Sequence, residues 1–101
     1  MKYQVFNRQE GDVKKMDEFL TMLRGALEKC NTELERLMKE DKERYATAKQ
    51  YEESYGSDDA LTQSAWNTWG YVYDDRQAVS ARIEEIEDAL RFVGRLRIGN
   101  Y

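Results

Sequence analysis

Residues 13–37, which read VKKMDEFLTMLRGALEKCNTELERL, decide the fold of this chain. Apolar side chains recur in this stretch at alternating spacings of three and four residues. They are Val13, Met16, Leu20, Leu23, Leu27, Cys30, Leu34 and Leu37. This spacing keeps them on one face of an α-helix, in a stripe that we call the seam. The residues between them are mostly charged, as expected of a face in contact with water. The stretch therefore predicts a long amphipathic helix.

The end of that helix is predicted by Gly56, which is followed by one Ser and two Asp residues. Glycine suits the left-handed residue after a helix, and Ser or Asp suits the N-cap of the next one. Beyond this break the same apolar spacing returns. Its positions are Leu61, Ala65, Trp69, Val72, Val79, Ile83, Ile86, Leu90 and Val93. We therefore expect a helix over about 12–55, a turn over about 56–58 and a helix over about 59–97.

Two helices joined by a short loop lie antiparallel to each other. The predicted fold is therefore all-α, a long antiparallel helical hairpin that resembles a coiled coil and forms one domain over residues 1–101. The loop lies at one end, the loop end, and both chain termini lie at the other, the root. Brief alternation of apolar residues at 2–6 and 95–98 leaves open a pair of short β segments at the root.

Three features interrupt the regular pattern. The sequence DKER at residues 41–44 breaks the first seam, which resumes with Tyr45 and Ala48 in what we interpret as a phase shift. The second seam has a gap at Arg76. Gly70 lies inside the second helix, where glycine costs about 1 kcal/mol, so it marks a candidate kink.

The composition argues against an enzyme. The chain contains no histidine, the residue most often used as a general base and as a metal ligand. Its one cysteine, Cys30, lies on the seam, where a small core residue is expected. We therefore expect no catalytic residues, no metal and no cofactor.

The charge and hydropathy patterns narrow the class of partner. The net charge of −4 does not fit a direct nucleic-acid binder. No apolar run approaches the ~18 to 20 residues of a membrane span, and the first ten residues lack the apolar core of a signal peptide. We expect a cytoplasmic protein that contacts neither nucleic acid nor membrane.

Residues 51–75 contain six acidic and six aromatic residues but no Lys or Arg. The predicted hairpin places this segment at the loop end. Aromatic anchors beside carboxylates are typical of a surface that binds a basic protein partner. The predicted partner-binding residues are Tyr51, Glu52, Glu53, Tyr55, Asp58, Asp59, Trp66, Tyr71, Tyr73, Asp74 and Asp75. The alternative interpretation is that the aromatic residues fill a wider core, which fits Trp69 because it lies on the seam.

These features predict a small non-enzymatic module that binds a basic surface on another protein. Basic surfaces often belong to grooves that bind nucleic acid, because such grooves are lined with Arg and Lys. The most concrete form of the hypothesis is an inhibitor of a nucleic-acid enzyme, of the kind carried by phages and mobile elements. Anti-CRISPR proteins are an analogy for this type.

An alternative hypothesis is a structural hairpin that acts by pairing helix with helix. In length and shape the chain resembles the WXG100 class of small secretion-associated helical hairpins. That class carries Trp-x-Gly in its turn, whereas Trp69 and Gly70 are adjacent here and follow the predicted turn by more than ten residues. Both hypotheses allow self-association, and we expect a homo-oligomer because two helices leave apolar residues beside the seam uncovered. These residues are Phe19, Met22, Met38, Phe92 and Leu96.

Overall fold

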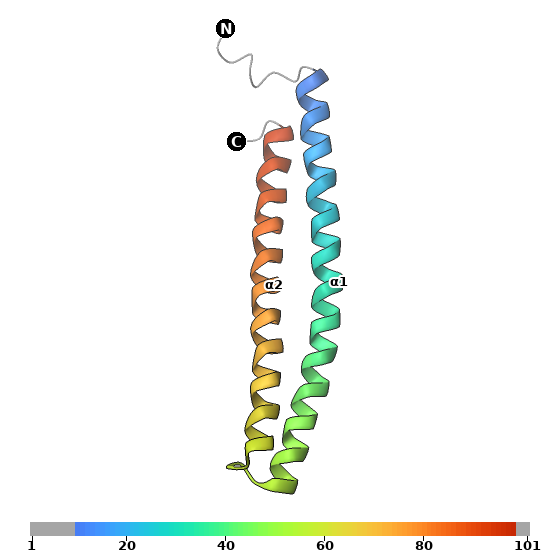
Figure 1. The fold of residues 1–101 in the computed structure, drawn as a ribbon. Helices are drawn as coiled ribbons and strands as arrows, with labels where there is room; N and C mark the ends of the chain where they lie inside the picture. Colours follow the sequence, from blue (N-terminus) through green and yellow to red (C-terminus); the bar gives the residue numbers. More distant parts are fainter. Residues whose placement is uncertain (1–9, 99–101) are drawn as a thin grey trace.

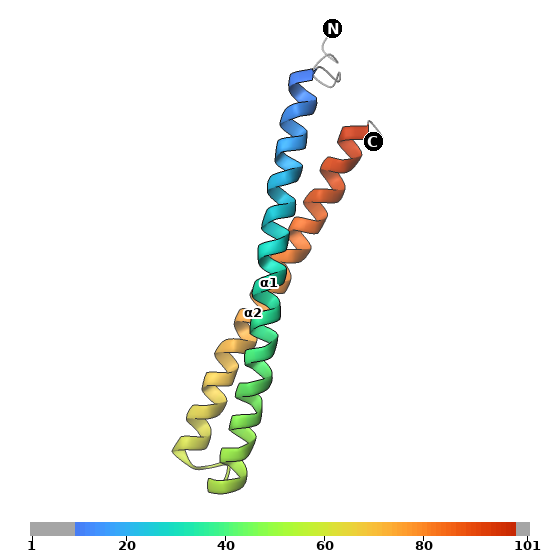
Figure 2. The ribbon, with the colours of Figure 1, turned by 90° about the vertical axis from the view of Figure 1, so that its right-hand side faces the viewer.

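The computed structural model describes residues 10–98 of the chain and the side chains of residues 13–96. It contains helix α1 (Glu10–Tyr55) and helix α2 (Ala60–Ile98), joined by a short loop. The helices lie side by side in opposite directions (Figure 1) and form a rod with extents of 73 × 19 × 16 Å. They cross in the second view (Figure 2), so their axes are inclined to each other. The prediction of a long antiparallel helical hairpin is confirmed.

The loop is held by backbone and side-chain hydrogen bonds. Gly56 has a φ of 90°, the left-handed conformation that ends α1, and its N–H donates to the carbonyl of Glu52 at 2.8 Å. Asp59 then caps α2, because its carboxylate accepts the backbone N–H of Leu61 at 2.8 Å. The glycine and the capping acid therefore explain why the chain reverses at this point.

The core is a narrow line between the helices. Its buried apolar residues are Leu20, Cys30, Leu37 and Ala48 from α1 and Val72, Val79 and Val93 from α2. Cys30 is buried and free, as its place on the seam predicts. Because a hairpin of two helices buries only one stripe of each helix, many other apolar side chains stay partly exposed.

The predicted phase shift in α1 is wrong. Asp41 is buried four residues after Leu37, and Ala48 is fully buried seven residues later, so the seam continues with its original spacing. Tyr45, expected on the shifted seam, lies beside it and is 44% exposed. The apparent gap at Arg76 is also a seam position, because Arg76 bonds to Asp41. A polar pair therefore occupies the seam where the apolar pattern fails.

The start of the second seam also differs from the prediction. Leu61 is 54% exposed, and Thr62 is fully buried in its place. The hydroxyl of Thr62 donates to the backbone carbonyl of Tyr51 at 3.1 Å, which compensates for burying a polar group.

The remaining expectations concern Gly70, the ends of the hairpin and membranes. Helix α2 runs unbroken through Gly70. Residues 95–98 belong to the last turn of α2 and form no strand, whereas residues 2–6 lie outside the described part of the chain. Neither α1 nor α2, as far as they are described, contains a stretch that is apolar enough to cross a membrane.

Candidate functional site

A buried polar group ties the helices together in the loop half of the rod. The carboxylate of Asp41 accepts the indole N–H of Trp69 at 2.9 Å and a guanidinium N–H of Arg76 at 2.8 Å. The Asp41 side chain is 13% exposed and that of Arg76 is 34% exposed. The hydrogen bond from Trp69, followed by the bond and the charge of Arg76, lowers the pKa of Asp41. These bonds stabilise the ionised carboxylate inside the seam.

Aromatic rings form a layer beside this group. We call Tyr45, Trp66, Trp69 and Tyr73 the aromatic cluster. Tyr45 meets Trp66 and Trp69 edge to face, with ring centroids 5.3 and 5.8 Å apart, and Trp69 also contacts Tyr73 at 5.4 Å. The indole N–H of Trp66 donates to the carboxylate of Glu52 at 3.1 Å. The cluster therefore widens the core on one side, and both of its indole N–H groups bond within the hairpin.

The other side of the loop end is more open. Tyr51 and Tyr55 contact each other edge to face, with centroids 5.8 Å apart, and both stay exposed. An open groove of about 290 Å³ runs between the helices there. Its lining residues are Arg44, Thr47, Tyr51, Leu61, Ser64, Ala65 and Thr68. This groove combines exposed apolar surface with hydroxyl groups.

The acidic residues near the loop divide into bonded and free carboxylates. Glu52 accepts the Trp66 indole, and Asp59 caps α2. Glu53 and Asp58 are exposed and make no hydrogen bond or ion pair within residues 13–96. Of these four residues, Glu53 and Asp58 can bind a partner without breaking a hydrogen bond of the hairpin.

Asp74 and Asp75 lie away from the loop. At 1.5 Å per residue they are about 25 Å along α2 from the turn. Both are exposed, and they follow Tyr71 by three and four residues. At 72%, Tyr71 is the most exposed large hydrophobic side chain among the described residues. The structure therefore separates the predicted acidic end into a loop group and a group on α2.

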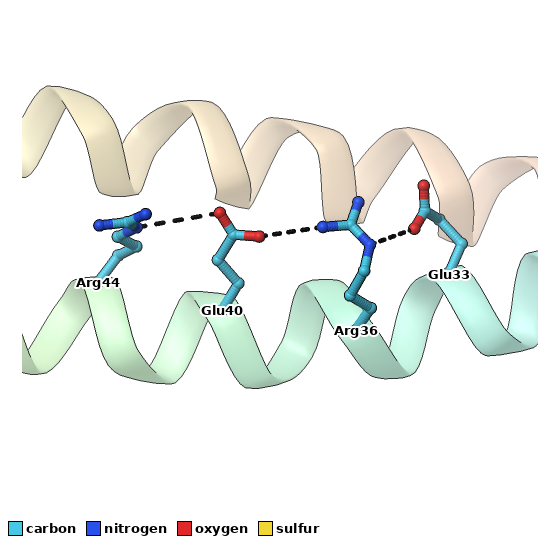
Figure 3. Close-up of polar contacts among 4 residues, drawn as sticks. All are labelled: Glu33, Arg36, Glu40 and Arg44. Carbon is cyan, nitrogen blue, oxygen red and sulfur yellow. Dashed lines mark hydrogen bonds and ion pairs between the residues drawn. The ribbon is translucent and has the colours of Figure 1, made fainter.

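The absence of bases in residues 51–75 does not make the surrounding surface free of bases. Helix α1 carries a row of charged residues, which we call the ladder, alongside α2 (Figure 3). It consists of Glu33, Arg36, Glu40 and Arg44. In the ladder Glu33 pairs with Arg36 at 2.6 Å, and Glu40 pairs with Arg36 at 3.1 Å and with Arg44 at 3.9 Å. The hydrogen bond from Arg36 lowers the pKa of Glu33. Because these pairs are solvated, they contribute little to stability.

Seven exposed residues remain as the candidate binding surface, which we call the acidic face. They are Tyr51, Tyr55, Asp58, Leu61, Tyr71, Asp74 and Asp75. Spacings of ten and four residues, each close to a whole number of helical turns, place Leu61, Tyr71 and Asp75 on one side of α2. Leu61 was missed from the sequence because it was assigned to the seam.

The other predicted site residues lie outside this surface. Glu52, Trp66 and Tyr73 belong to or bond with the aromatic cluster on the opposite side of the seam. Asp59 caps α2, and Glu53 is an exposed residue of α1 that lines no groove near the loop.

Two further observations bear on the site. Within residues 13–96 no group of three or more His, Cys, Asp or Glu residues is arranged to hold a metal ion. No protein-family model, curated protein or solved structure matches this chain.

Proposed function

We propose that this chain is a non-enzymatic protein-binding module that docks its acidic face on a basic surface of another protein. The observation that carries the proposal is the exposure of Tyr71 at 72%, with Asp74 and Asp75 three and four residues after it. Tyrosine is enriched among residues that dominate binding energy, and a carboxylate beside it suits Arg or Lys on the partner.

The rigidity of the hairpin supports the same function. Hydrogen bonds between the helices hold both ends of the α2 stretch that carries much of the acidic face. Thr62 bonds to Tyr51 near the loop, and Trp69 and Arg76 bond to Asp41 farther along. A surface held in place before binding loses less conformational entropy when it binds. A stiff rod also suits insertion into a groove that is lined with basic residues.

The concrete form of the proposal is an inhibitor of a nucleic-acid enzyme, of the type found in phages and mobile elements. The carboxylates of Asp58, Asp74 and Asp75 would take the places of phosphate groups in a groove built for nucleic acid. Such an inhibitor competes directly with the nucleic acid. A DNA or RNA oligonucleotide that the enzyme binds should therefore displace the hairpin.

The test is affinity capture with matched charge variants. The acidic-face variant carries Asp58→Asn, Asp74→Asn and Asp75→Asn, and the control variant carries Glu28→Gln, Glu84→Gln and Glu87→Gln. Both lose three exposed carboxylates, so their net charges are equal. A partner captured by the wild type and the control, lost by the acidic-face variant and released by an oligonucleotide supports the proposal. Equal capture by all three proteins would contradict it.

The alternative function is pairing along the helices, as in a structural or secretion-associated hairpin. The exposed apolar residues at the root favour this possibility. It predicts that neither charge variant loses its partner, because the binding energy would come from apolar contacts along the rod.

A further inference from the structure

The root of the hairpin carries a second surface, separate from the acidic face. Met22 is 58% exposed and Phe92 is 56% exposed, and Phe19 is also exposed. Thr62 bonds to the carbonyl of Tyr51, which fixes the register of the two antiparallel helices. Continued to the root, this register brings Phe19 and Met22 level with the turn of α2 that carries Phe92.

Heptad spacing places these residues on one side of the rod. Phe19 lies four heptads before Thr47, and Leu96 lies four heptads after Thr68. Thr47 and Thr68 line the same groove near the loop, so residues at these intervals flank the seam on that same side. We call Phe19, Met22, Ala26, Ala89, Phe92 and Leu96 the root patch.

The size of the root patch matches a small interface. Aromatic side chains bury roughly 150 to 250 Å² each, so three half-exposed large side chains leave about 300 Å² of apolar surface. Two such patches contribute about 600 Å² of apolar surface. Because somewhat more than half of an interface is apolar, the total buried area is about 1,000 Å². That area is the lower limit for a specific interface, so the association should be weak and depend on concentration.

The rod as a whole also exposes an excess of surface. Its accessible area is 7770 Å², whereas a compact monomer of 12.0 kDa exposes about 6,000 Å². A second copy of the same rod, laid along the first, would cover part of this excess.

The charges beside the root patch identify the occupant and its direction. Lys15 and Lys29 lie one heptad before and one heptad after Met22, and Glu85 lies one heptad before Phe92. When two copies pack with their loops at the same end, α1 of each copy lies over α2 of the other. Lys29 of each copy then lies opposite Glu85 of the other copy. When the loops lie at opposite ends, in a head-to-tail arrangement, Lys15 of each copy lies opposite Lys29 of the other. These like charges repel, which disfavours that arrangement.

We infer that the root patch binds a second copy of this chain, with the two rods parallel and their loops at the same end. The contact is confined to the root half, because the root patch ends there and charged residues, among them Arg36, Glu40 and Asp75, flank the seam farther along the rods. Because the root patch and the acidic face lie on the same side of the rod, the acidic faces of the two copies also face each other in this arrangement. The inference stands independently of the proposed function.

The first test compares two methionines that are similarly exposed on opposite sides of the seam. Met22 belongs to the root patch, and Met38 lies one heptad before Tyr45 on the side of the aromatic cluster, where it is 50% exposed. Analytical ultracentrifugation from about 1 to 200 μM, the range expected for a weak interface, should show the wild type and Met38→Glu dimerising. Met22→Glu should stay monomeric with unchanged helical circular dichroism. A monomeric wild type at every concentration, or dissociation by Met38→Glu, would overturn the inference.

The second test reports the direction of the rods. Lys29→Glu and Glu85→Lys should each weaken the dimer about tenfold or more, and the double variant should restore it. Spin labels on Ser57→Cys, in a Cys30→Ala background that remains helical, should lie within about 40 Å of each other in the dimer. Head-to-tail packing would separate them by about 100 Å, since the root patch lies about 50 Å from the loop. That longer distance, or a double variant that stays monomeric, would contradict the parallel arrangement.

Discussion

Replacing Asp41 with alanine should destabilise the hairpin far more than removing any of its exposed carboxylates. The substitution leaves the indole N–H of Trp69 half buried without its acceptor at 2.9 Å. It also removes the counter-charge 2.8 Å from the Arg76 guanidinium. No other carboxylate in the described residues both lies in the seam and joins the two helices.

The magnitude follows from the burial of each partner. An unsatisfied buried donor costs about 1–3 kcal/mol, and breaking a fully buried ion pair costs about 3–5 kcal/mol. Arg76 is 34% exposed and can turn toward water, which reduces the second cost. We therefore expect Asp41→Ala to lower the free energy of unfolding by about 2–4 kcal/mol. This is a large share of the roughly 5–15 kcal/mol of a typical domain.

The assay is equilibrium urea denaturation, followed by far-ultraviolet circular dichroism at one protein concentration. Asp88→Ala is the matched control, because Asp88 pairs only with Arg91 and both side chains are mostly exposed. Its effect should be close to zero. Equal stability of the Asp41 and Asp88 variants would show that the buried group does not hold the helices together.

Acid should remove the same contribution. The pKa of Asp41 is lowered, first by the hydrogen bond from Trp69 and then by Arg76. The folded protein therefore gains stability from the ionised carboxylate above the ordinary aspartate pKa of about 3.9, and loses it as the pH falls through the lowered folded value. The stability difference between the wild type and Asp41→Asn should stay constant from neutral pH to about pH 5 and shrink below about pH 4. A difference that grows in acid would contradict this reasoning.

Three further changes test the packing and the loop by the same denaturation assay. Leu37→Ala should cost about 2–5 kcal/mol because Leu37 is almost fully buried, whereas Met38→Ala should cost little; similar losses would misplace the seam. Gly56→Ala should cost about 1–2 kcal/mol, since alanine is strained at a φ of 90°, and an unchanged stability would argue against a left-handed residue there. Asp59→Ala should cost about 1 kcal/mol and Asp59→Asn much less, because asparagine also caps a helix; equal losses would exclude capping as the cause.

The sequence was sufficient to predict the hairpin. The apolar spacing over residues 13–37 predicts α1, and Gly56 predicts its end, because both signals are local. The polar pair in the seam was not predicted. Asp41 and Arg76 each appeared as a break in the pattern of one helix, and only the register between the helices shows that they meet. Opposite charges at seam positions on the two sides of the turn were the signal that could have revealed the pair.

The candidate site was predicted less completely. The composition of residues 51–75 drew attention to residues that are exposed, such as Tyr71, but it could not separate free side chains from those that bond within the hairpin. Trp66 and Glu52 bond to each other across the two helices, and Tyr45, which packs against Trp66, lies outside the segment. These contacts depend on tertiary packing, which the composition of one segment does not encode.

The measurement that tests the central claim most directly is the rate at which a captured partner associates with the hairpin at two ionic strengths. We expect the acidic-face variant to associate more slowly than the wild type and to lose most of its sensitivity to salt, because steering by exposed carboxylates is screened over about 10 Å at 0.1 M salt. The control variant with Glu28, Glu84 and Glu87 neutralised should associate like the wild type at both ionic strengths. Equal association rates for the acidic-face variant and the wild type would show that this surface does not bind the partner.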